Sequence, residues 1–197
     1  QRTVGYCLGE KDWHNQPSAV RAERIAEILR VNDSPLVEPD NDAKRLLSVF
    51  RALIFCRRKY GQHAIGAFLV RHCRGIDDVF AALLLGRWAG MHDAESAVPL
   101  DVVPAFETGA ELRDAAGLIR ELLNHDVYKA HLASRDNEQT VMLSASGLRT
   151  DGGVAASRWN MQQAHTQLGE LFNAAGIDYT LFHGRGGTVG RGGGPSY

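Results

Sequence analysis

Hydrophobic residues in the C-terminal two thirds of the chain fall into two alternating patterns. Short apolar runs bounded by polar residues are typical of buried strands, and they occur at residues 64–70, 100–106, 140–143 and 177–182. The stretches between them carry apolar residues three and four positions apart, which predicts helices at residues 76–88, 111–123 (with room to extend to 131) and 154–175. This alternation indicates parallel strands joined by right-handed helical crossovers.

Two further helices are predicted before the first strand. Residues 19–29 carry one apolar stripe, and the helix ends before Pro35, because proline disfavours a helix at the residue that precedes it. A second helix begins after Asp40, a residue type that caps helices, and ends in the basic residues 57–59. These cations could form a phosphate-binding patch, but the simpler explanation is that they complement the negative end of the helix dipole. Residues 1–20 show only weak patterning and are left unplaced.

The pattern divides the chain into a helical lead-in segment, residues 1–60, and a partial βα barrel or sheet, residues 61–197, within a single domain. Four βα units form half of a (β/α)8 barrel of the TIM type, but a doubly wound open sheet has the same local pattern. Periodicity alone therefore leaves the choice between these two α/β folds open.

The composition narrows the classes of function. The 197 residues carry a net charge of −1, which argues against a general role on nucleic acids or membrane surfaces. Cys7, Cys56 and Cys73 lack metal-ligand spacing, and their odd number suits reduced thiols in a cytosolic protein. No apolar run approaches the roughly 18 residues of a transmembrane helix, and no stretch resembles a signal peptide. The expected location is the cytoplasm.

Polar and ionisable residues follow every predicted strand. They are residues 71–73, Glu107 with Thr108, residues 144–151, and His183. Because the carboxyl ends of parallel strands share one face, these residues predict a functional site there. Glu107 could serve as a ligand for Mg²⁺ or Mn²⁺, which prefer oxygen ligands, or it could cap the helix that follows.

The chain ends in a segment that is rich in glycine and arginine. Eight of the twelve residues from 184 to 195 are Gly or Pro, and Arg185 and Arg191 lie among them. Glycine allows close backbone approach, and the arginine fork binds carboxylate or phosphate through two parallel hydrogen bonds. The segment thus fits an anion-binding loop, although an RNA-binding tail of the RGG type and a flexible terminus have similar compositions.

Two motifs carry a resemblance to a known family. Residues 182–195 read Phe-His-Gly-Arg-Gly-Gly-Thr-Val-Gly-Arg-Gly-Gly-Gly-Pro and resemble the glycine-rich signature of phosphoenolpyruvate carboxylase position for position. Residues 103–108, Val-Pro-Ala-Phe-Glu-Thr, are similar to the family's Val-Pro-Leu-Phe-Glu-Thr. The resemblance covers roughly residues 42–197 and includes the last helix, where Trp159 is expected to pack against its neighbours.

The resemblance implies a fold and a reaction. The family is built on a β-barrel embedded in helices, so the expected fold is α/β, a helix-rich part of a (β/α)8 TIM-type barrel with about four βα units. It implies a piece of a longer, homotetrameric protein that joins bicarbonate to phosphoenolpyruvate, giving oxaloacetate and phosphate with Mg²⁺ or Mn²⁺ as cofactor. No nucleic-acid or membrane partner is expected.

Specific residues receive roles from the resemblance. It assigns catalytic roles to His183, Arg185 and Arg191, and it assigns substrate binding to Arg185 and Arg191 together with Gly186 and Gly187 of the same loop. The arginines would supply positive charge where negative charge develops in the reaction.

The metal site departs from the family pattern. The resemblance carries metal binding onto Glu107, but the family's second metal-binding aspartate falls on Gly147 and its active-site lysine on Thr150. Asp151, or Ser146, could reach the ion through water, and Asp151 is the second candidate ligand. Two alternatives follow: a divergent carboxylase, or a homologue that binds phosphoenolpyruvate or another anion without catalysis. The family's Thr-Ala-His-Pro-Thr motif is absent here, so the isolated fragment is expected to be inactive.

Overall fold

A four-stranded parallel sheet forms the centre of the molecule. The computed structural model describes residues 1–31, 34–61, 64–92, 97–144 and 153–184. The strands follow one another across the sheet in chain order, and all neighbouring pairs are parallel. They are β1 (Ala67–Arg71), β2 (Asp101–Phe106), β3 (Glu138–Ser144) and β4 (Asp178–Gly184). The predicted alternation is confirmed as a helix-rich α/β fold with a parallel sheet, which is compatible with part of a barrel.

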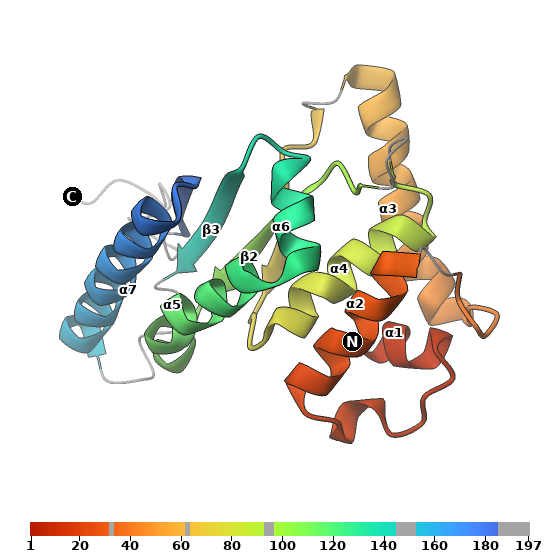
Figure 1. The fold of residues 1–197 in the computed structure, drawn as a ribbon, viewed down its shortest axis with the longest axis horizontal. Helices are drawn as coiled ribbons and strands as arrows, with labels where there is room; N and C mark the ends of the chain where they lie inside the picture. Colours follow the sequence, from red (N-terminus) through yellow and green to blue (C-terminus); the bar gives the residue numbers. More distant parts are fainter. Residues whose placement is uncertain (32–33, 62–63, 93–96, 145–152, 185–197) are drawn as a thin grey trace, which may run out of the picture.

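Helices connect the strands and cover one face of the sheet. The connecting helices are α4 (Ile76–Trp88), α5 (Gly109–Asn124), α6 (Asp126–Ala133) and α7 (Gly153–Ala175). Figure 1 shows α5 and α7 side by side, and the two helices are in contact. The expected helix at residues 76–88 has the same bounds in the structure, and the other two agree within two residues at each end.

The lead-in segment is also helical and packs onto α4. It consists of α1 (Arg2–Cys7), a short 3-10 helix (Trp13–Asn15), α2 (Ser18–Val31) and α3 (Asn41–Tyr60). Asp40 caps α3 as predicted, since its carboxylate accepts a hydrogen bond of 2.8 Å from the Ala43 amide. The basic residues 57–59 occupy the last turn of this helix, where they complement its dipole.

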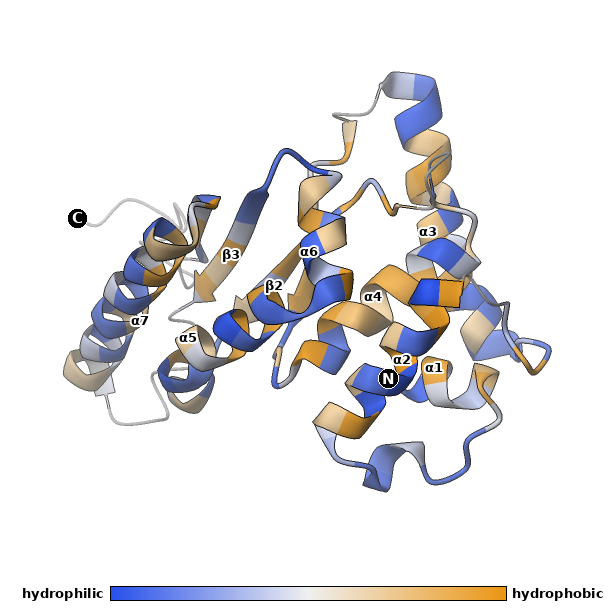
Figure 2. Ribbon diagram, in the orientation of Figure 1, coloured by the Kyte–Doolittle hydropathy of each residue, from blue (hydrophilic) through white to orange (hydrophobic). Residues whose placement is uncertain are grey.

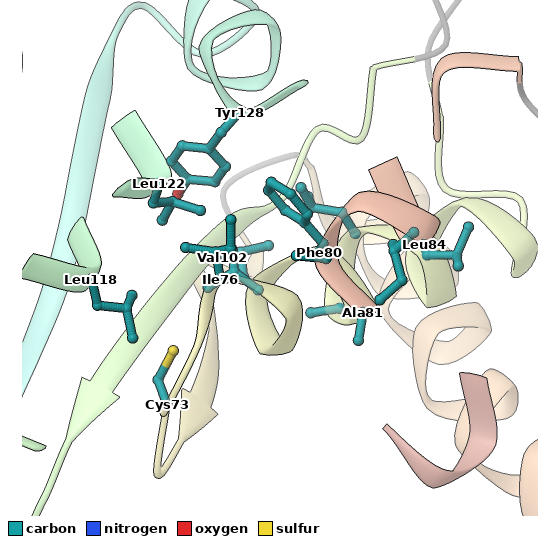
Figure 3. Close-up of a cluster of buried hydrophobic side chains, with 14 of the residues drawn as sticks. Cys73, Ile76, Phe80, Ala81, Leu84, Val102, Leu118, Leu122 and Tyr128 are labelled. Atoms are coloured by element: carbon teal, nitrogen blue, oxygen red, sulfur yellow. The ribbon is translucent and has the colours of Figure 1, made fainter. Parts of the chain in front are cut away.

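The main core lies between the sheet and α4, α5 and α6. Figure 3 shows the buried side chains of Ile76, Phe80, Val102, Leu122 and Tyr128 converging from these elements. Burial of each such side chain contributes about 1.5–3 kcal/mol. In Figure 2, α4 is apolar over most of its surface, whereas α5 and α7 carry hydrophilic residues on their outer sides. α4 is therefore enclosed by other elements, and α5 and α7 face solvent on one side.

Several details differ from the sequence-based predictions. The strand predicted at residues 64–70 begins at Ala67 and is half exposed, because β1 is an edge strand that pairs only with β2 in the described chain. The extension of α5 is a separate helix, α6, since the His125 ring accepts a hydrogen bond from the Val127 amide and starts a new helix. Trp159 is 65% exposed, so the prediction that it packs is wrong for the described residues.

The two faces of the sheet differ in exposure. Alternate residues of each strand pack against the helices, as Phe68 and Leu181 do, and the residues between them face the other side. On that side Leu69 is 42% and Phe182 is 53% exposed. We call this second side the open face. None of the helices in the described part of the chain is long and apolar enough to cross a membrane.

Candidate functional site at the carboxyl ends of the strands

The parallel arrangement brings the carboxyl ends of the four strands to one edge. Arg71 is paired in register with Ala105 of β2, and Ser144 with Gly184 of β4. At this edge Glu107 directly follows β2, and His183 is the penultimate residue of β4. The structure thus confirms the shared edge on which these residues were predicted to lie, although it does not bring all of them together.

An ion pair between Arg71 and Glu107 dominates this edge. The Arg71 guanidinium donates from Nε to Glu107 Oε1 at 2.6 Å and from Nη2 to Oε2 at 2.7 Å. The Glu107 side chain is 6% exposed, whereas that of Arg71 is 68% exposed. The arginine hydrogen bonds lower the pKa of the Glu107 carboxyl, against the effect of burial. Glu107 is therefore held as a carboxylate at neutral pH.

Helix α5 is capped by residues other than Glu107. The Thr108 hydroxyl accepts a hydrogen bond of 3.2 Å from the Glu111 amide, and Glu111 Oε2 accepts one of 3.1 Å from the Thr108 amide. This reciprocal pair is a capping box. Glu111 Oε2 also accepts a 2.8 Å hydrogen bond from the Glu107 amide. The alternative in which Glu107 caps the helix is wrong, and its carboxylate is paired with Arg71 at the strand edge instead.

The turn after β1 adds two more basic side chains. His72 adopts a left-handed backbone conformation with φ of 51°, and its Nδ1 lies 3.2 Å from Glu111 Oε1. Its Nε2 lies 3.9 Å from Glu107 Oε2, and Arg74 Nε lies 3.9 Å from Glu111 Oε1. We refer to Arg71, His72, Arg74, Glu107 and Glu111 as the strand-end cluster.

Cys73, which follows His72, plays no part in this chemistry. Its side chain is buried, and burial raises the pKa of its thiol far above the usual range. A buried thiol of this kind is a poor nucleophile, and Cys73 is free, as expected for a reduced cysteine.

The described residues do not fit a divalent metal at Glu107 as they stand. Both Glu107 oxygens accept hydrogen bonds from Arg71, and the Glu111 oxygens are engaged by His72 and by two backbone amides. In the ranges that the structure describes, no group of three or more His, Cys, Asp or Glu residues could hold a metal ion. The second candidate ligand, Asp151, lies outside these ranges, as do Gly147 and Thr150.

His183 lies on the helix-covered face of the sheet. His183 and Tyr179 are four residues apart on β4, so their side chains point to the same face of the sheet. The Tyr179 ring stacks on that of Phe172 of α7, with 5.0 Å between the ring centroids. The His183 ring meets that of His165, also on α7, edge to face at 5.8 Å. The Arg71 side chain, by contrast, points to the open face, as does that of Leu69 two residues earlier on β1. The catalytic role expected for His183 stays a prediction, and the structure places its ring on the opposite side from the strand-end cluster.

The end of β4 is closely packed against β3. The Ser144 hydroxyl donates a 2.9 Å hydrogen bond to the Gly184 carbonyl oxygen, and a Cβ atom added at Gly184 would collide with the Met142 side chain. A larger residue at this position would have to displace the end of the Met142 side chain and press on Ser144. The four expected loop residues, Arg185, Gly186, Gly187 and Arg191, lie outside the described residues.

Arg71 is the site residue that sequence reasoning left without a role. The sequence predicts only that Arg71 is a polar residue at the end of the first strand, and it indicates no partner for it. The available signal was its position: the last residue of one parallel strand lies beside the residues that end the next. Using that signal required the register of β1 against β2, which periodicity does not provide.

The fold and the site together define the class of protein. It is a helix-rich α/β domain that carries an ionic cluster at the carboxyl edge of a parallel sheet. Comparison with known proteins identifies the family: the model of the phosphoenolpyruvate carboxylase family matches residues 3–197. The chain belongs to this family. The match also includes the lead-in helices, which extends the resemblance beyond the expected start near residue 42.

Curated relatives agree with the family match. The chain is 41% identical to a phosphoenolpyruvate carboxylase of Xanthomonas oryzae pv. oryzae over 98% of its own length and 21% of the relative's. It is 39% identical to the Mycobacterium avium protein of the same name over 94% of the chain and 20% of the relative. The chain thus spans about a fifth of the length of the curated relatives it matches.

Proposed function

We propose that the complete protein containing this chain is a phosphoenolpyruvate carboxylase, a carbon–carbon lyase that forms oxaloacetate and phosphate from phosphoenolpyruvate and bicarbonate. The observation that carries this proposal is the family match along residues 3–197, together with relatives of that name at about 40% identity. Replenishing oxaloacetate by carbon dioxide fixation in the cytoplasm is the corresponding physiological role.

We further propose that the sheet is an arc of a (β/α)8 barrel. In such a barrel the helices surround the strands and the inner face is filled by side chains from the whole ring. The helices here cover one face only, and Leu69 and Phe182 on the open face are half exposed. Apolar residues at these positions suit a barrel interior that further strands complete. A homotetramer, as the family resemblance implies, is the proposed assembly.

The reaction demands positive charge at two places. Bicarbonate oxygen attacks the phosphoryl group, which yields carboxyphosphate and the enolate of pyruvate; carboxyphosphate then releases CO2 and phosphate, and the enolate carbon attacks CO2. Charge develops first on the phosphoryl oxygens and then on the enolate, and fixed cations stabilise both. We assign Arg185 and Arg191 to this role, with Gly186 and Gly187 allowing close approach of the backbone and His183 assisting at the strand end.

The family resemblance implies Mg²⁺ or Mn²⁺ as cofactor, with Glu107 as its ligand. The described residues do not fit that ion while Arg71 holds both Glu107 oxygens. The chemistry proposed above depends on the chain's own arginines. Phosphoenolpyruvate and bicarbonate are the proposed partners, with no role for nucleic acid or a membrane.

A second candidate function is anion binding without turnover. Gly147 and Thr150 stand where the family has its second metal-binding aspartate and its lysine, and Glu107 is already neutralised by an arginine. Both features favour a homologue that retains the anion-binding loop and lacks the carboxylation chemistry.

Arg191→Ala in the complete protein tests the loop assignment. Loss of a cation that stabilises the transition state should abolish detectable oxaloacetate formation. Arg113→Ala, an exposed position on α5, is the matched control and should keep full activity. Oxaloacetate is followed by its reduction to malate, and retained activity in Arg191→Ala would remove the loop from the mechanism.

A further inference from the structure

The hydrogen-bond geometry at Glu107 leaves little room for a metal ion. Arg71 presents its planar fork to the carboxylate, with donor–acceptor distances of 2.6 and 2.7 Å, and so uses both oxygens at once. A divalent ion bound directly to either oxygen would lie within about 5 Å of the guanidinium, so the two positive charges repel each other at the buried Glu107 carboxylate. Arg71 and a metal ion therefore compete for the same carboxylate.

The charge of the strand-end cluster points the same way. Two guanidinium groups, Arg71 and Arg74, face two carboxylates, Glu107 and Glu111, and the cluster is balanced before His72 is counted. Magnesium and manganese prefer oxygen ligands, and a carboxylate attracts them through its negative charge. A cluster that is already neutral lacks the excess negative charge that would draw a divalent ion out of water.

The backbone places Arg71 and Glu107 side by side. Arg71 is the last residue of β1 and lies in register with Ala105, two residues before Glu107. The Cys73 amide donates a 3.2 Å hydrogen bond to the Ala105 carbonyl oxygen, which continues the strand contact past the left-handed turn at His72. The Arg71 side chain thus starts from a position set by the sheet, on the open face on which the Glu107 carboxylate also lies. Strand register, not a chance surface contact, brings the two groups together.

We infer that Arg71 supplies at Glu107 the positive charge that the family resemblance assigns to a divalent metal, so that this strand end is neutralised by a side chain and binds Mg²⁺ or Mn²⁺ only weakly. The inference rests on the proposed function for the assignment of Glu107 as the metal-binding position. It makes Arg71 a specificity-determining residue for the cofactor.

Mn²⁺ binding to the complete protein, measured by electron paramagnetic resonance of the free ion, provides the test. Arg71→Gln keeps a long polar side chain and removes the charge, and it should bind Mn²⁺ about tenfold more tightly than the unmodified protein. Arg120→Gln makes the same charge change at an exposed position near the far end of α5, away from the strand-end cluster, and it should change the affinity by no more than about twofold. The double variant Arg71→Gln with Glu107→Gln should lose the gain.

Two results would overturn the inference. One is equal Mn²⁺ affinity in the unmodified protein and in Arg71→Gln, each verified as folded by circular dichroism. The other is a gain in Arg71→Gln that persists when Glu107 is also replaced, because the ion would then bind elsewhere. Oxaloacetate formation is measured separately in the same samples. Absence of carboxylation counts against the proposed function, whereas the competition at Glu107 is judged by the Mn²⁺ affinity alone.

Discussion

Glu111 is the residue whose removal should loosen the site most directly. Its Oε2 accepts hydrogen bonds of 2.8 Å from the Glu107 amide and 3.1 Å from the Thr108 amide, and its Oε1 lies 3.2 Å from the His72 ring. The side chain is 6% exposed. One residue thus ties the start of α5 to the turn after β1 and to the backbone of Glu107.

The expected cost follows from these contacts. Loss of a capping side chain costs about 1 kcal/mol, and leaving the buried Glu107 amide without its acceptor costs about 1 kcal/mol more. A total of about 2 kcal/mol corresponds to about a 30-fold change in a local opening equilibrium. Glu111→Ala should therefore accelerate amide hydrogen exchange across residues 105–112 by about that factor.

Hydrogen exchange followed by mass spectrometry measures this in the complete protein, where a single unfolding transition cannot be assumed. Glu121→Ala is the matched control, because it makes the same substitution at an exposed position of the same helix. Exchange in Glu111→Ala within about threefold of the unmodified protein would show that the capping box does not hold this edge, since threefold is only about 0.6 kcal/mol.

Two further predictions concern the core. Burial lowers the pKa of His131 to about 3 in the folded protein. As the pH falls below about 6.5, this residue therefore takes up a proton in the unfolded chain but not in the folded one. The stability that the neutral ring provides is present above about pH 6.5 and declines by about 2 kcal/mol by pH 5. His131→Leu should lack this part of the pH dependence of the melting temperature, and an identical pH profile would contradict the reasoning. Phe80→Ala removes a fully buried ring that meets the His125 ring at 4.7 Å, and it should cost about 3–5 kcal/mol in denaturant unfolding. Phe55→Ala, at a 59% exposed position, should cost no more than about 0.5 kcal/mol, and equal costs would refute the assigned core.

Sequence patterning predicted the elements well where local physics decides them. The apolar positions of α4 and the capping residue Asp40 gave correct bounds because periodicity and cap chemistry are local properties. The predicted burial of β1 was wrong because burial depends on which strands flank it. The first helix, α1, was missed because six residues are too few to show a period.

The sequence predicted where the site lies, at the carboxyl ends of the strands, but not how its side chains are arranged. Glu107 was recognised from its position after a strand, and the structure shows that another residue caps α5. The ion pair between Arg71 and Glu107 depends on the register of β1 against β2. The contact of His183 with α7 depends on which face of the sheet its side chain points to at the end of β4. Neither quantity can be read from the spacing of residues along one chain.

The most direct test of the central claim is the incubation of the complete protein with phosphoenolpyruvate, 13C-labelled bicarbonate and Mn²⁺, with malate dehydrogenase and NADH present to trap oxaloacetate. The account predicts 13C in a carboxylate of malate, with one phosphate released for each malate formed. Phosphoenolpyruvate that binds but yields neither labelled malate nor phosphate would contradict carboxylation and would favour the anion-binding homologue marked by Gly147 and Thr150.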